Sequence, residues 1–476
     1  MKRRDFLKSA GILATGAVIA PKALAGNAEA GAADNFNPET TERGDLNDSF
    51  KMKSLRADVN RPVTVAVIGA GNRGNVYARY SKQFPSIMKI VAVADIRPER
   101  IASFRKLYNL PESACYNSAD EFLAQPKMCD AVIVSTPDDV HYVPTMKALK
   151  AGYHVLLEKP MAQTEKEVRD ILEMSRKTGG IVGVCHVLRY APYFVAMKAA
   201  LQSGAVGDVV SVQHMEPIQY AHMAHSYVRG NWRDSDQTTP IILAKSCHDL
   251  DILRFLIDKP CQTIVADGSL YLFKEANAPE GAPMKCTDGC PHEETCPYSA
   301  LEIYHRKRRH IHALFNDYTK KHSADDVMKA LKEGPYGRCV YHCDNNQPDH
   351  YVANMVFGDG VTASFSMEAF TPYGSRRTRI MGTTGFLDGD GHQFTITEFR
   401  TGKRHVWNKK ISEIPEYNDA GHGGGDHGLL RDFLEAVCWN DVTRLSTAVD
   451  VSVESHVMGF CAEQSRKNGK KVKIKI

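Results

Sequence analysis

The chain has 476 residues, of which 43% are hydrophobic and 24% are charged. These proportions are typical of a soluble globular protein and exclude a disordered, collagenous or coiled-coil chain. The formal net charge is +4, but all of it comes from residues 1–25, where five lysines and arginines oppose one aspartate. The rest of the chain is neutral overall, which argues against nucleic acid or a charged membrane surface as its partner.

Residues 1–25 have the three parts of a secretory signal peptide. Arg3 and Arg4 precede Phe-Leu-Lys, residues 10–20 are apolar but too short for a permanent membrane span, and Ala23 and Ala25 form the small-residue pattern of a cleavage site. The paired arginines resemble the twin-arginine signal, which exports folded proteins, and an ordinary secretory signal is the alternative. We predict cleavage after Ala25 and a periplasmic or extracytoplasmic protein that is not inserted in the membrane.

Residues 26–61 lack an apolar period and are predicted to form a linker or an extended arm. Short apolar runs separated by helix-length segments then follow. In chain order, we predict strands at 63–68, 89–94, 130–135, 153–157 and 180–184. This alternation indicates βαβ units and a parallel sheet.

Beyond residue 187 the apolar runs become longer and alternate with polar residues, a pattern typical of an antiparallel sheet. The predicted strands are 209–215, 261–273, 351–357, 362–367, 377–382, 393–399 and 471–476. Helical patterns at 428–439 and 447–465 precede the last of them. We therefore predict an α/β protein with one domain at 62–186 and a second at 187–476.

A glycine turn at 69–74, Gly-Ala-Gly-Asn-Arg-Gly, follows the first strand and opens a helix, and Asp95 ends the second strand. This is the dinucleotide-binding fingerprint, in which the glycines let the backbone approach a pyrophosphate and the acid accepts hydrogen bonds from a ribose. The pattern predicts a Rossmann domain that binds NAD, because Asp95 would repel a 2′-phosphate. Two nearby arginines keep NADP as the alternative. The cofactor residues predicted here are Gly69, Gly71, Asn72, Arg73, Gly74, Asp95 and Arg97.

Further motifs are Ser-Thr-Pro at 135–137, Glu-Lys-Pro at 158–160 and Lys-Ser-Cys-His-Asp-Leu-Asp at 245–251. With these motifs the sequence resembles the Gfo/Idh/MocA oxidoreductases, which act mainly on sugars and cyclitols, from residue 62 to the C-terminus. The resemblance implies a Rossmann domain followed by an α/β domain with an open, largely antiparallel sheet, and a homo-oligomer, either a dimer or a tetramer. The cofactor residues added by these motifs and by the domain junction are Ser135, Thr136, Pro137, His141, Glu158, Lys159 and His186.

The resemblance also implies catalytic roles. Lys159 stands where the family has its catalytic lysine and His248 where it has its acid/base histidine. A neutral His248 can take the proton of a hydroxyl while Lys159 stabilises the developing oxyanion, so hydride can pass from a secondary carbinol to tightly bound NAD. The family's aspartate four residues before the histidine is replaced by Ala244. Lys245 beside it can act in its place, either in catalysis or on an anionic group such as a uronate.

A polar loop before residue 245 and two flanking segments supply candidate sugar contacts, because they combine hydrogen-bond donors with aromatic faces. Structural roles are the alternative for each of them. The glycine-rich turn at 421–425 is also predicted either to close over the substrate or to serve only as a connection. The candidate substrate residues are Arg189, Tyr193, Tyr227, Arg229, Trp232, Asp251 and His422.

Five of the 12 cysteines cluster in a predicted insertion near 280–345. Cys286, Cys290 and Cys296 are closely spaced, and Cys339 and Cys343 follow later. Three thiols in a Gly/Pro-containing loop and a distant fourth predict a tetrahedral structural zinc site, completed by Cys339 or Cys343. Disulfides, which an oxidising compartment favours, and an iron–sulfur cluster are the alternatives.

Two rival functions remain at this stage. The first is an NAD-dependent glycoside hydrolase, in which transient oxidation acidifies a neighbouring C–H and permits elimination; the missing aspartate favours it, whereas the intact Glu-Lys-Pro motif favours a dehydrogenase. The second is a non-catalytic sugar-binding protein that retains NAD as a structural group. All three readings share a small-molecule saccharide or cyclitol ligand, and we expect no nucleic-acid partner.

Overall fold

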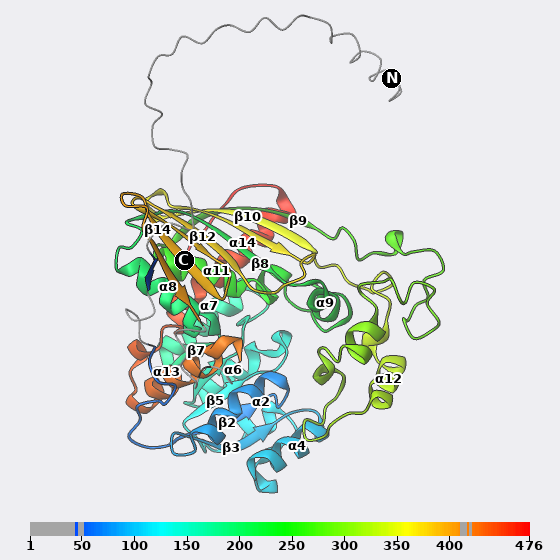
Figure 1. The fold of residues 1–476 in the computed structure, drawn as a ribbon. Helices are drawn as coiled ribbons and strands as arrows, with labels where there is room; N and C mark the ends of the chain where they lie inside the picture. The colour runs from blue at the N-terminus through cyan, green and yellow to red at the C-terminus, as the bar shows by residue number, and fades with distance from the viewer. Residues whose placement is uncertain (1–42, 46–51, 410–416, 418–420) are drawn as a thin grey trace, which may run out of the picture. The chain divides into compact units, whose positions relative to one another are not determined.

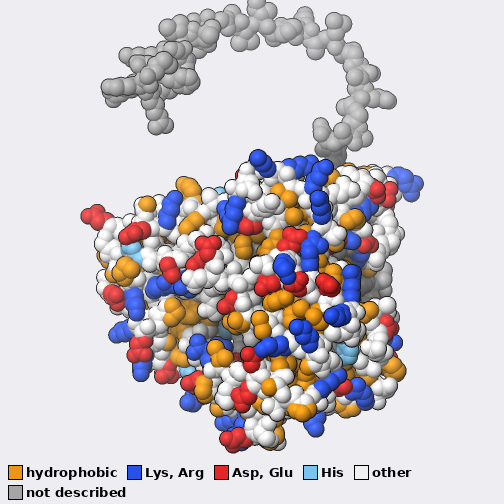
Figure 2. Space-filling model, turned by 180° about the vertical axis from the view of Figure 1, so that it is seen from behind, with side chains coloured by type: hydrophobic (Ala, Val, Ile, Leu, Met, Phe, Trp, Pro, Cys, Tyr) orange, Lys and Arg blue, Asp and Glu red, His pale blue; other side chains and the backbone are white. Residues whose placement is uncertain are grey.

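The computed structural model describes residues 43–45, 52–409, 417 and 421–476. The predicted signal peptide and most of the predicted linker lie outside these described residues. Within them, no helix combines the length and the apolar character that a membrane crossing requires. On the face shown in Figure 2, basic and acidic side chains are interspersed, as expected for a chain whose net charge is small.

The first domain is built on a six-stranded sheet in which all paired strands are parallel, with the order β4-β3-β2-β5-β6-β7. Its strands are β2 (Val63–Ile68), β3 (Met88–Ala94), β4 (Cys115–Tyr116), β5 (Ala131–Val134), β6 (His154–Leu157) and β7 (Val182–Val184). Every residue of β5 is buried, because helices cover both faces of such a sheet and its strands are apolar throughout.

The connecting helices of the first domain are α2 (Asn72–Ala78), α3 (Tyr80–Gln83), α4 (Pro98–Tyr108), α5 (Ala119–Leu123), α6 (Tyr142–Lys150) and α7 (Glu165–Thr178). The local sequence sets where α7 starts, because Thr164 and Glu167 form a reciprocal capping box. Gly179, which follows α7, is left-handed, with a φ of 70°, and glycine adopts this conformation without steric cost.

The second sheet has ten strands in the order β1-β15-β14-β13-β12-β8-β11-β10-β9-β16. Its strands are β1 (Arg43–Asp45), β8 (Val209–Pro217), β9 (Cys261–Ser269), β10 (His350–Phe357), β11 (Thr362–Glu368), β12 (Arg377–Gly382), β13 (Gly385–Gly389), β14 (Gln393–Glu398), β15 (Arg404–Asn408) and β16 (Val472–Lys473). All pairs are antiparallel except β8 with β11 and β1 with β15. The predicted fold class is therefore confirmed.

The helices of the second domain are α8 (Pro192–Gln202), α9 (Tyr220–Met223), α10 (Ile241–Ala244), α11 (Cys247–Ile257), α12 (Ala324–Glu333), α13 (Gly425–Trp439) and α14 (Val449–Asn468). Of these, α11 and α14 pack on the second sheet, and α13 and α14 contact the first domain (Figure 1). The insertion between β9 and β10 carries α12, drawn in yellow-green in Figure 1. The predicted strand at 261–273 ends earlier, at Ser269, and the predicted terminal strand is reduced to two residues.

The described end of the predicted linker is packed against the first domain. Leu55 is fully buried, and its carbonyl accepts a hydrogen bond from the Tyr80 hydroxyl at 2.6 Å. The Trp439 indole, at the end of α13, donates to the carbonyl of Asp58 at 2.8 Å. Residues 52–61 of the predicted linker or arm therefore pack against the folded chain.

Candidate active site

The glycine turn lies at the C-terminal end of β2, where neighbouring backbone comes close. Gly69 has a φ of 95°, and a Cβ on it would stand 2.7 Å from the backbone of Ser135. A Cβ on Gly74 would stand 2.2 Å from the carbonyl oxygen of Gly69. At Gly71 a Cβ would meet only the Arg100 side chain, at 3.4 Å. The first and third glycines are therefore required by the fold, whereas the second leaves room for a ligand to approach the backbone.

Asp95 follows β3 and lies beside this turn. Its buried carboxylate accepts hydrogen bonds from the backbone N–H of Ala70 at 2.8 Å and of Arg97 at 2.9 Å. The Arg100 guanidinium is 3.9 Å away, and the side chain of Ile96 is 80% exposed. An acid, an exposed apolar side chain and an open glycine turn at the ends of parallel strands form a site that fits the adenosine and pyrophosphate of NAD.

Arg73 takes a different position from the one that its place in the motif suggested. Its guanidinium bonds to Glu158 at 2.6 Å and Asp426 at 2.6 Å, and it also donates to the Tyr77 hydroxyl. Burial of Glu158 opposes the ionisation of its carboxyl group, but the positive charges of Arg73 and Lys159 outweigh burial and lower the pKa of Glu158. Arg73 is thus held by the buried carboxylates of Glu158 and Asp426, which corrects its assignment as a cation that could attract a 2′-phosphate.

The loops after β5 and β6 are tied together beside Lys159. The His141 ring lies between two backbone carbonyls, 2.8 Å from that of Pro160 and 2.8 Å from that of Thr136. The hydroxyl of Thr136 is buried and has no hydrogen-bond partner. His141 therefore fixes the loops rather than facing a ligand with its ring nitrogens, while the Thr136 hydroxyl remains available to one.

Lys159 joins the two domains. Its Nζ donates to the carbonyl of Ala244, at the end of α10, at a distance of 2.7 Å. Ala244 is the position at which the sequence lacks the expected aspartate. A backbone carbonyl thus supplies the hydrogen-bond acceptor that a carboxylate would have supplied.

His248 lies in the first turn of α11, and its buried Nδ1 has no hydrogen-bond partner. Burial, reinforced by the positive charge of Lys159, holds the pKa of His248 well below its usual range. The rings of His186 and His422 are 6.1 Å and 6.0 Å away, centre to centre. The imidazole is therefore neutral at physiological pH and has a ring nitrogen free to exchange a proton.

Lys245 is buried one residue beyond α10. Its Nζ is 3.3 Å from Glu216, at the end of β8, and Glu216 also pairs with Arg376 at 2.5 Å. Arg376 continues to Asp249 at 2.6 Å. Burial lowers the pKa of Lys245, although Glu216 opposes this shift, and the nearby Arg376 and Lys159 add to it. Sequence reasoning missed Glu216 and Arg376, because neither stands in a motif.

The insertion contributes histidines to the same region. The ring of His310 stacks on His225 with their centres 4.5 Å apart, and its centre is 5.5 Å from that of His222. Burial lowers the pKa of His222 well below its usual value, and Lys245 is the first charge that adds to this effect. His310 thus lies beside His222 and His225, although it is distant from the catalytic motifs in sequence.

The insertion also contacts the nucleotide side of the first domain. The Arg100 side chain on α4 donates to the Asn316 side chain at 3.2 Å, and the Tyr318 backbone N–H donates to the Ser103 hydroxyl at 3.2 Å. Figure 1 shows this segment approaching α4 from the second domain. The insertion therefore bridges both domains next to Asp95.

Four residues expected at the ligand sites have other partners. Arg189 and Asp251 bind each other through two hydrogen bonds of 2.7 and 2.6 Å. His186 contacts the Ser455 hydroxyl at 3.2 Å. Tyr193 is buried among the aromatic rings of Phe394 and Trp407 under the second sheet. The expectation of sugar contact is corrected for Arg189, Asp251 and Tyr193, because their polar groups or rings face protein.

The expectation of sugar contact is also corrected for Arg229. Its side chain is buried against the insertion, where it donates to the carbonyls of Tyr298 and Arg338. Tyr227 and Trp232 do lie together, with ring centres 6.5 Å apart, and Tyr227 is close to His222. His422 accompanies Asp426 at 3.1 Å and faces His248. These three remain candidates for substrate contact.

The predicted zinc ligands share one pocket, which is lined by Cys286, Cys290, Cys296 and Cys339 but not by Cys343. None of the described cysteines forms a disulfide. Within the described part of the chain, no group of three or more His, Cys, Asp or Glu side chains is arranged to hold a metal ion. The four cysteines thus line the same pocket. That they bind zinc stays a prediction.

Comparison with known proteins gives two family matches that together span most of the chain. The model of an oxidoreductase family with an NAD-binding Rossmann fold matches residues 63–186, and the model of the C-terminal alpha/beta domain of the same family matches residues 198–474.

Three relatives illustrate the similarity. The putative oxidoreductase YteT of Bacillus subtilis is 26% identical over 74% of this chain and 83% of its own. A 1,5-anhydro-D-fructose reductase of Ensifer adhaerens is 30% identical, over 39% of this chain and 55% of its own. The crystal structure of an inositol dehydrogenase homolog from Azotobacter vinelandii, complexed with NADH and myo-inositol, matches 88% of this chain and 100% of its own with a TM-score of 0.61 and 16% identity.

The geometry and these matches agree on both domains. The glycine turn, Asp95 and the strand ends form a nucleotide site, and Lys159 reaches the second domain at the carbonyl of Ala244, four residues before His248. The chain belongs to the Gfo/Idh/MocA oxidoreductase family and has both the NAD-binding Rossmann domain and the C-terminal α/β domain of that family.

Proposed function

We propose that this protein is an NAD-dependent dehydrogenase that oxidises a secondary carbinol of a sugar or cyclitol. The observation that carries the proposal is that Lys159 of the first domain hydrogen-bonds to Ala244 of the second domain, and that its charge adds to the burial that lowers the pKa of His248. The anhydrofructose reductase and the inositol-bound structure support the substrate class, because their ligands are polyols or sugars.

The side chains suit this reaction. His248 takes the hydroxyl proton at its unpartnered ring nitrogen, and the Lys159 ammonium stabilises the negative charge that develops on the carbinol oxygen. NAD, held at the glycine turn, supplies the hydride acceptor. Lys245, fixed by Glu216, adds a second cation to the cleft and orients a substrate oxygen. The buried Arg73–Glu158–Asp426 network holds the Glu-Lys-Pro loop in place.

We further propose that the cofactor is retained through many turnovers. The contacts of Asn316 with Arg100 and of Tyr318 with Ser103 hold the insertion beside the adenosine side of the site, so release requires this bridge to open. Retention suits a protein that works outside the cytoplasm, where free NAD is scarce. Replacing Arg3 and Arg4 by lysine should then abolish export of the full chain, as followed by cell fractionation.

The test is to purify the protein without added cofactor and offer sugars, cyclitols and chromogenic glycosides. Absorbance of the bound nicotinamide and release of the aglycone are followed together. We expect stoichiometric reduction without aglycone release, and renewed turnover when a second carbonyl substrate is added. Catalytic release without net reduction would instead establish the redox-neutral glycoside hydrolase.

Lys159→Ala is the matched variant for this test. Turnover should fall by about 10²–10³-fold, because the developing oxyanion loses its cation, while bound NAD remains. Lys166→Ala, at an exposed position, is the control. A sugar-binding protein without activity would retain its ligand affinity in both variants and show no turnover in either.

A further inference from the structure

Arg229 is a buried cation that has no acid beside it. Only 1% of the residue is exposed. Its Nε donates to the carbonyl of Arg338 at 2.6 Å, and its Nη2 donates to the carbonyl of Tyr298 at 2.7 Å and lies 3.7 Å from the Cys286 sulfur. Its Nη1 has no hydrogen-bond partner, and the ionisable side chains that act on it in the described chain are Tyr304 and the cysteines Cys286, Cys339 and Cys343. Because arginine stays protonated and an unpaired buried charge is costly, this side chain requires an anion.

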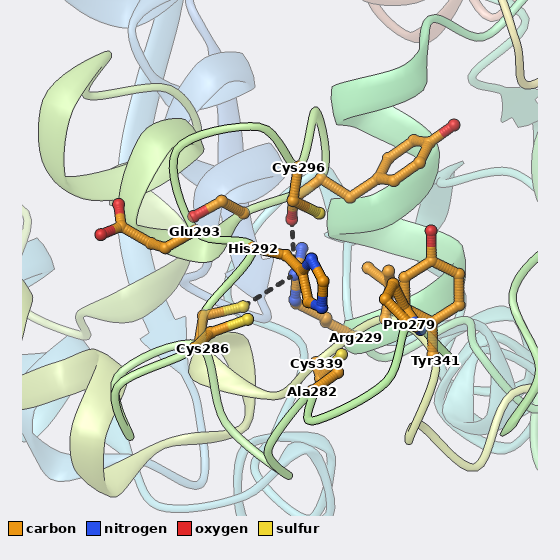
Figure 3. A pocket seen from close by; sticks show the side chains of 13 residues that line it. Arg229, Pro279, Ala282, Cys286, His292, Glu293, Cys296, Cys339 and Tyr341 are labelled. Carbon is orange, nitrogen blue, oxygen red and sulfur yellow. Dashed lines mark hydrogen bonds between the residues drawn. The ribbon is translucent and has the colours of Figure 1, made fainter. Parts of the chain in front are cut away.

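Sulfur is the donor that the surroundings offer. Cys286, Cys290, Cys296 and Cys339 line the pocket next to Arg229, and Figure 3 shows three of them labelled around the guanidinium. The other candidate ligands of the pocket are engaged elsewhere: the His292 ring contacts the carbonyl of Glu280 at 2.7 Å, and Glu293 pairs with Arg306.

The backbone brings the distant cysteines together. The N–H of Cys286 donates to the carbonyl of Gly337 at 2.8 Å, and the N–H of Cys339 donates to the carbonyl of Met284 at 2.8 Å. These two bonds hold the two ends of the insertion side by side. Between them, the N–H of Cys296 donates to the carbonyl of His292 at 2.9 Å and closes the turn that returns the third thiol to the pocket.

We propose that these four cysteines bind a zinc ion as a tetrathiolate and that Arg229 is the counter-charge of this centre. Four thiolates outweigh the charge of one divalent ion, so the centre is an anion. Binding releases the four thiol protons and transfers no electrons. Because tetrahedral Zn–S bonds are about 2.3 Å long, binding requires the four sulfurs of the pocket to converge on one point.

The neighbouring cysteine is excluded by its contacts. The Cys343 thiol donates to the carbonyl of Cys339 at 3.2 Å and does not line the pocket. It lies in the same insertion and is also partly buried. Cys343→Ser is therefore a matched control for any substitution among the four ligands.

The first experiment measures metal in the full mature chain, purified under reducing conditions without chelator. We expect one zinc per chain in the wild type and in Cys343→Ser, and at least a ten-fold loss of zinc in Cys290→Ser and Cys339→Ser. A wild type without metal, one that contains iron with labile sulfide, or one with disulfides among the four cysteines would overturn the proposal. Equal zinc in all variants would also overturn it.

A second experiment does not depend on ligand variants that fold. The wild-type protein is alkylated with and without prior removal of zinc, and the modified cysteines are identified by mass spectrometry. Cys286, Cys290, Cys296 and Cys339 should become reactive together only after zinc removal, whereas Cys343 should not change with them. Independent reactivity of the four thiols would contradict a shared metal.

The role of the arginine has its own readout. Arg229→Met keeps all four sulfurs but removes the counter-charge, so zinc should pass to a chromogenic chelator at least ten-fold faster than from the wild type. Arg233→Met, which breaks an ion pair with Asp344 nearby, is the control and should not change this rate. Equal rates in Arg229→Met and the wild type would remove Arg229 from the proposal.

Discussion

Two regions of this molecule bury arginine in different ways. At the junction of the two sheets, Arg73, Arg189 and Arg376 each bind at least one buried carboxylate at 2.7 Å or less. Against the insertion, the side chain of Arg229 is more deeply buried than these three, but it bonds to carbonyls and approaches a thiol. The first region completes its charge pairs with its own side chains. In the second region, we infer that zinc-bound thiolates balance the charge of Arg229. Removal of zinc should therefore disturb the second region and leave the first unchanged.

The largest expected effect is the loss of stability when the buried ion pair between Arg189 and Asp251 is broken. Arg189→Met leaves the buried carboxylate of Asp251 without its partner and should lower the free energy of unfolding by about 3–5 kcal/mol. The double variant Arg189→Met/Asp251→Leu should recover most of this loss, because no charge remains buried. Urea unfolding checks both. Arg176→Met, which breaks an exposed pair with Asp450, should cost less than about 1 kcal/mol, and an equal cost in all three would refute the comparison.

The glycine turn separates residues required by the fold from one required by the ligand. Gly74→Ala would place a Cβ 2.2 Å from the carbonyl oxygen of Gly69 and should destabilise the protein by about 3 kcal/mol. Gly71→Ala has room in the fold and should leave the melting temperature of the cofactor-free protein nearly unchanged while it weakens NAD binding. Calorimetry with and without NAD distinguishes the two. Equal NAD affinity in Gly71→Ala and the wild type would place the pyrophosphate elsewhere.

A smaller effect is expected at Lys245. Lys245→Met removes a cation from the cleft but leaves Glu216 paired with Arg376, so the protein should fold normally. We expect kcat to fall by about 10–100-fold, which corresponds to about 1.4–2.7 kcal/mol. Steady-state kinetics on the identified substrate measure it. Should only KM rise, Lys245 would bind the substrate equally in the ground and transition states.

The smallest effect concerns two histidines, His456 and His310, whose surroundings favour the neutral ring. Burial lowers the pKa of His456 to about 3 and, together with nearby histidine and arginine, that of His310 to about 4. Below pH 6.5 the unfolded chain takes up protons that the folded protein does not, so stability should fall as the pH falls towards these values, by up to about 1.4 kcal/mol per pH unit for each histidine. Urea midpoints at pH 7, 6 and 5 measure the slope.

The variant His456→Gln tests how much His456 contributes to the dependence of stability on pH. Glutamine can still accept from the N–H of Met161 and donate to the carbonyl of Ser452, the two hydrogen bonds of the histidine. The dependence of stability on pH should become shallower by about the contribution of one histidine. An unchanged slope would mean that His456 is not among the groups that take up protons on unfolding.

Local sequence patterns were sufficient to predict most helices and strands and the glycine turn of the site. The glycine turn with Asp95 was recognisable because strand, turn, helix and acid follow one another within about 35 residues, and close backbone approach permits only glycine at two of its positions. Lys159 and His248 were predicted from motifs. The short β16 and the early end of β9 were misjudged, because apolar alternation alone does not show where a strand loses its partner.

Other assignments depended on contacts between residues far apart in sequence. Arg189, Arg229 and Tyr193 have side chains that suit a sugar, yet the fold directs each of them to protein partners. Glu216 and Arg376 stand in no motif, and their pairing with Lys245 and Asp249 depends on how β8 and the segment before β12 meet α11. Such partners cannot be read from residue type or spacing.

The sequence by itself indicated the family through the resemblance of its motifs. It also determined the α/β fold class and the position of the glycine turn, because these depend on short-range backbone geometry and on periodic burial. Only the tertiary structure decided which charges pair, that Ala244 provides a carbonyl to Lys159, and that four cysteines share one pocket with Arg229. These outcomes depend on desolvation and on partner distances. Both are fixed when the domains and the insertion pack together.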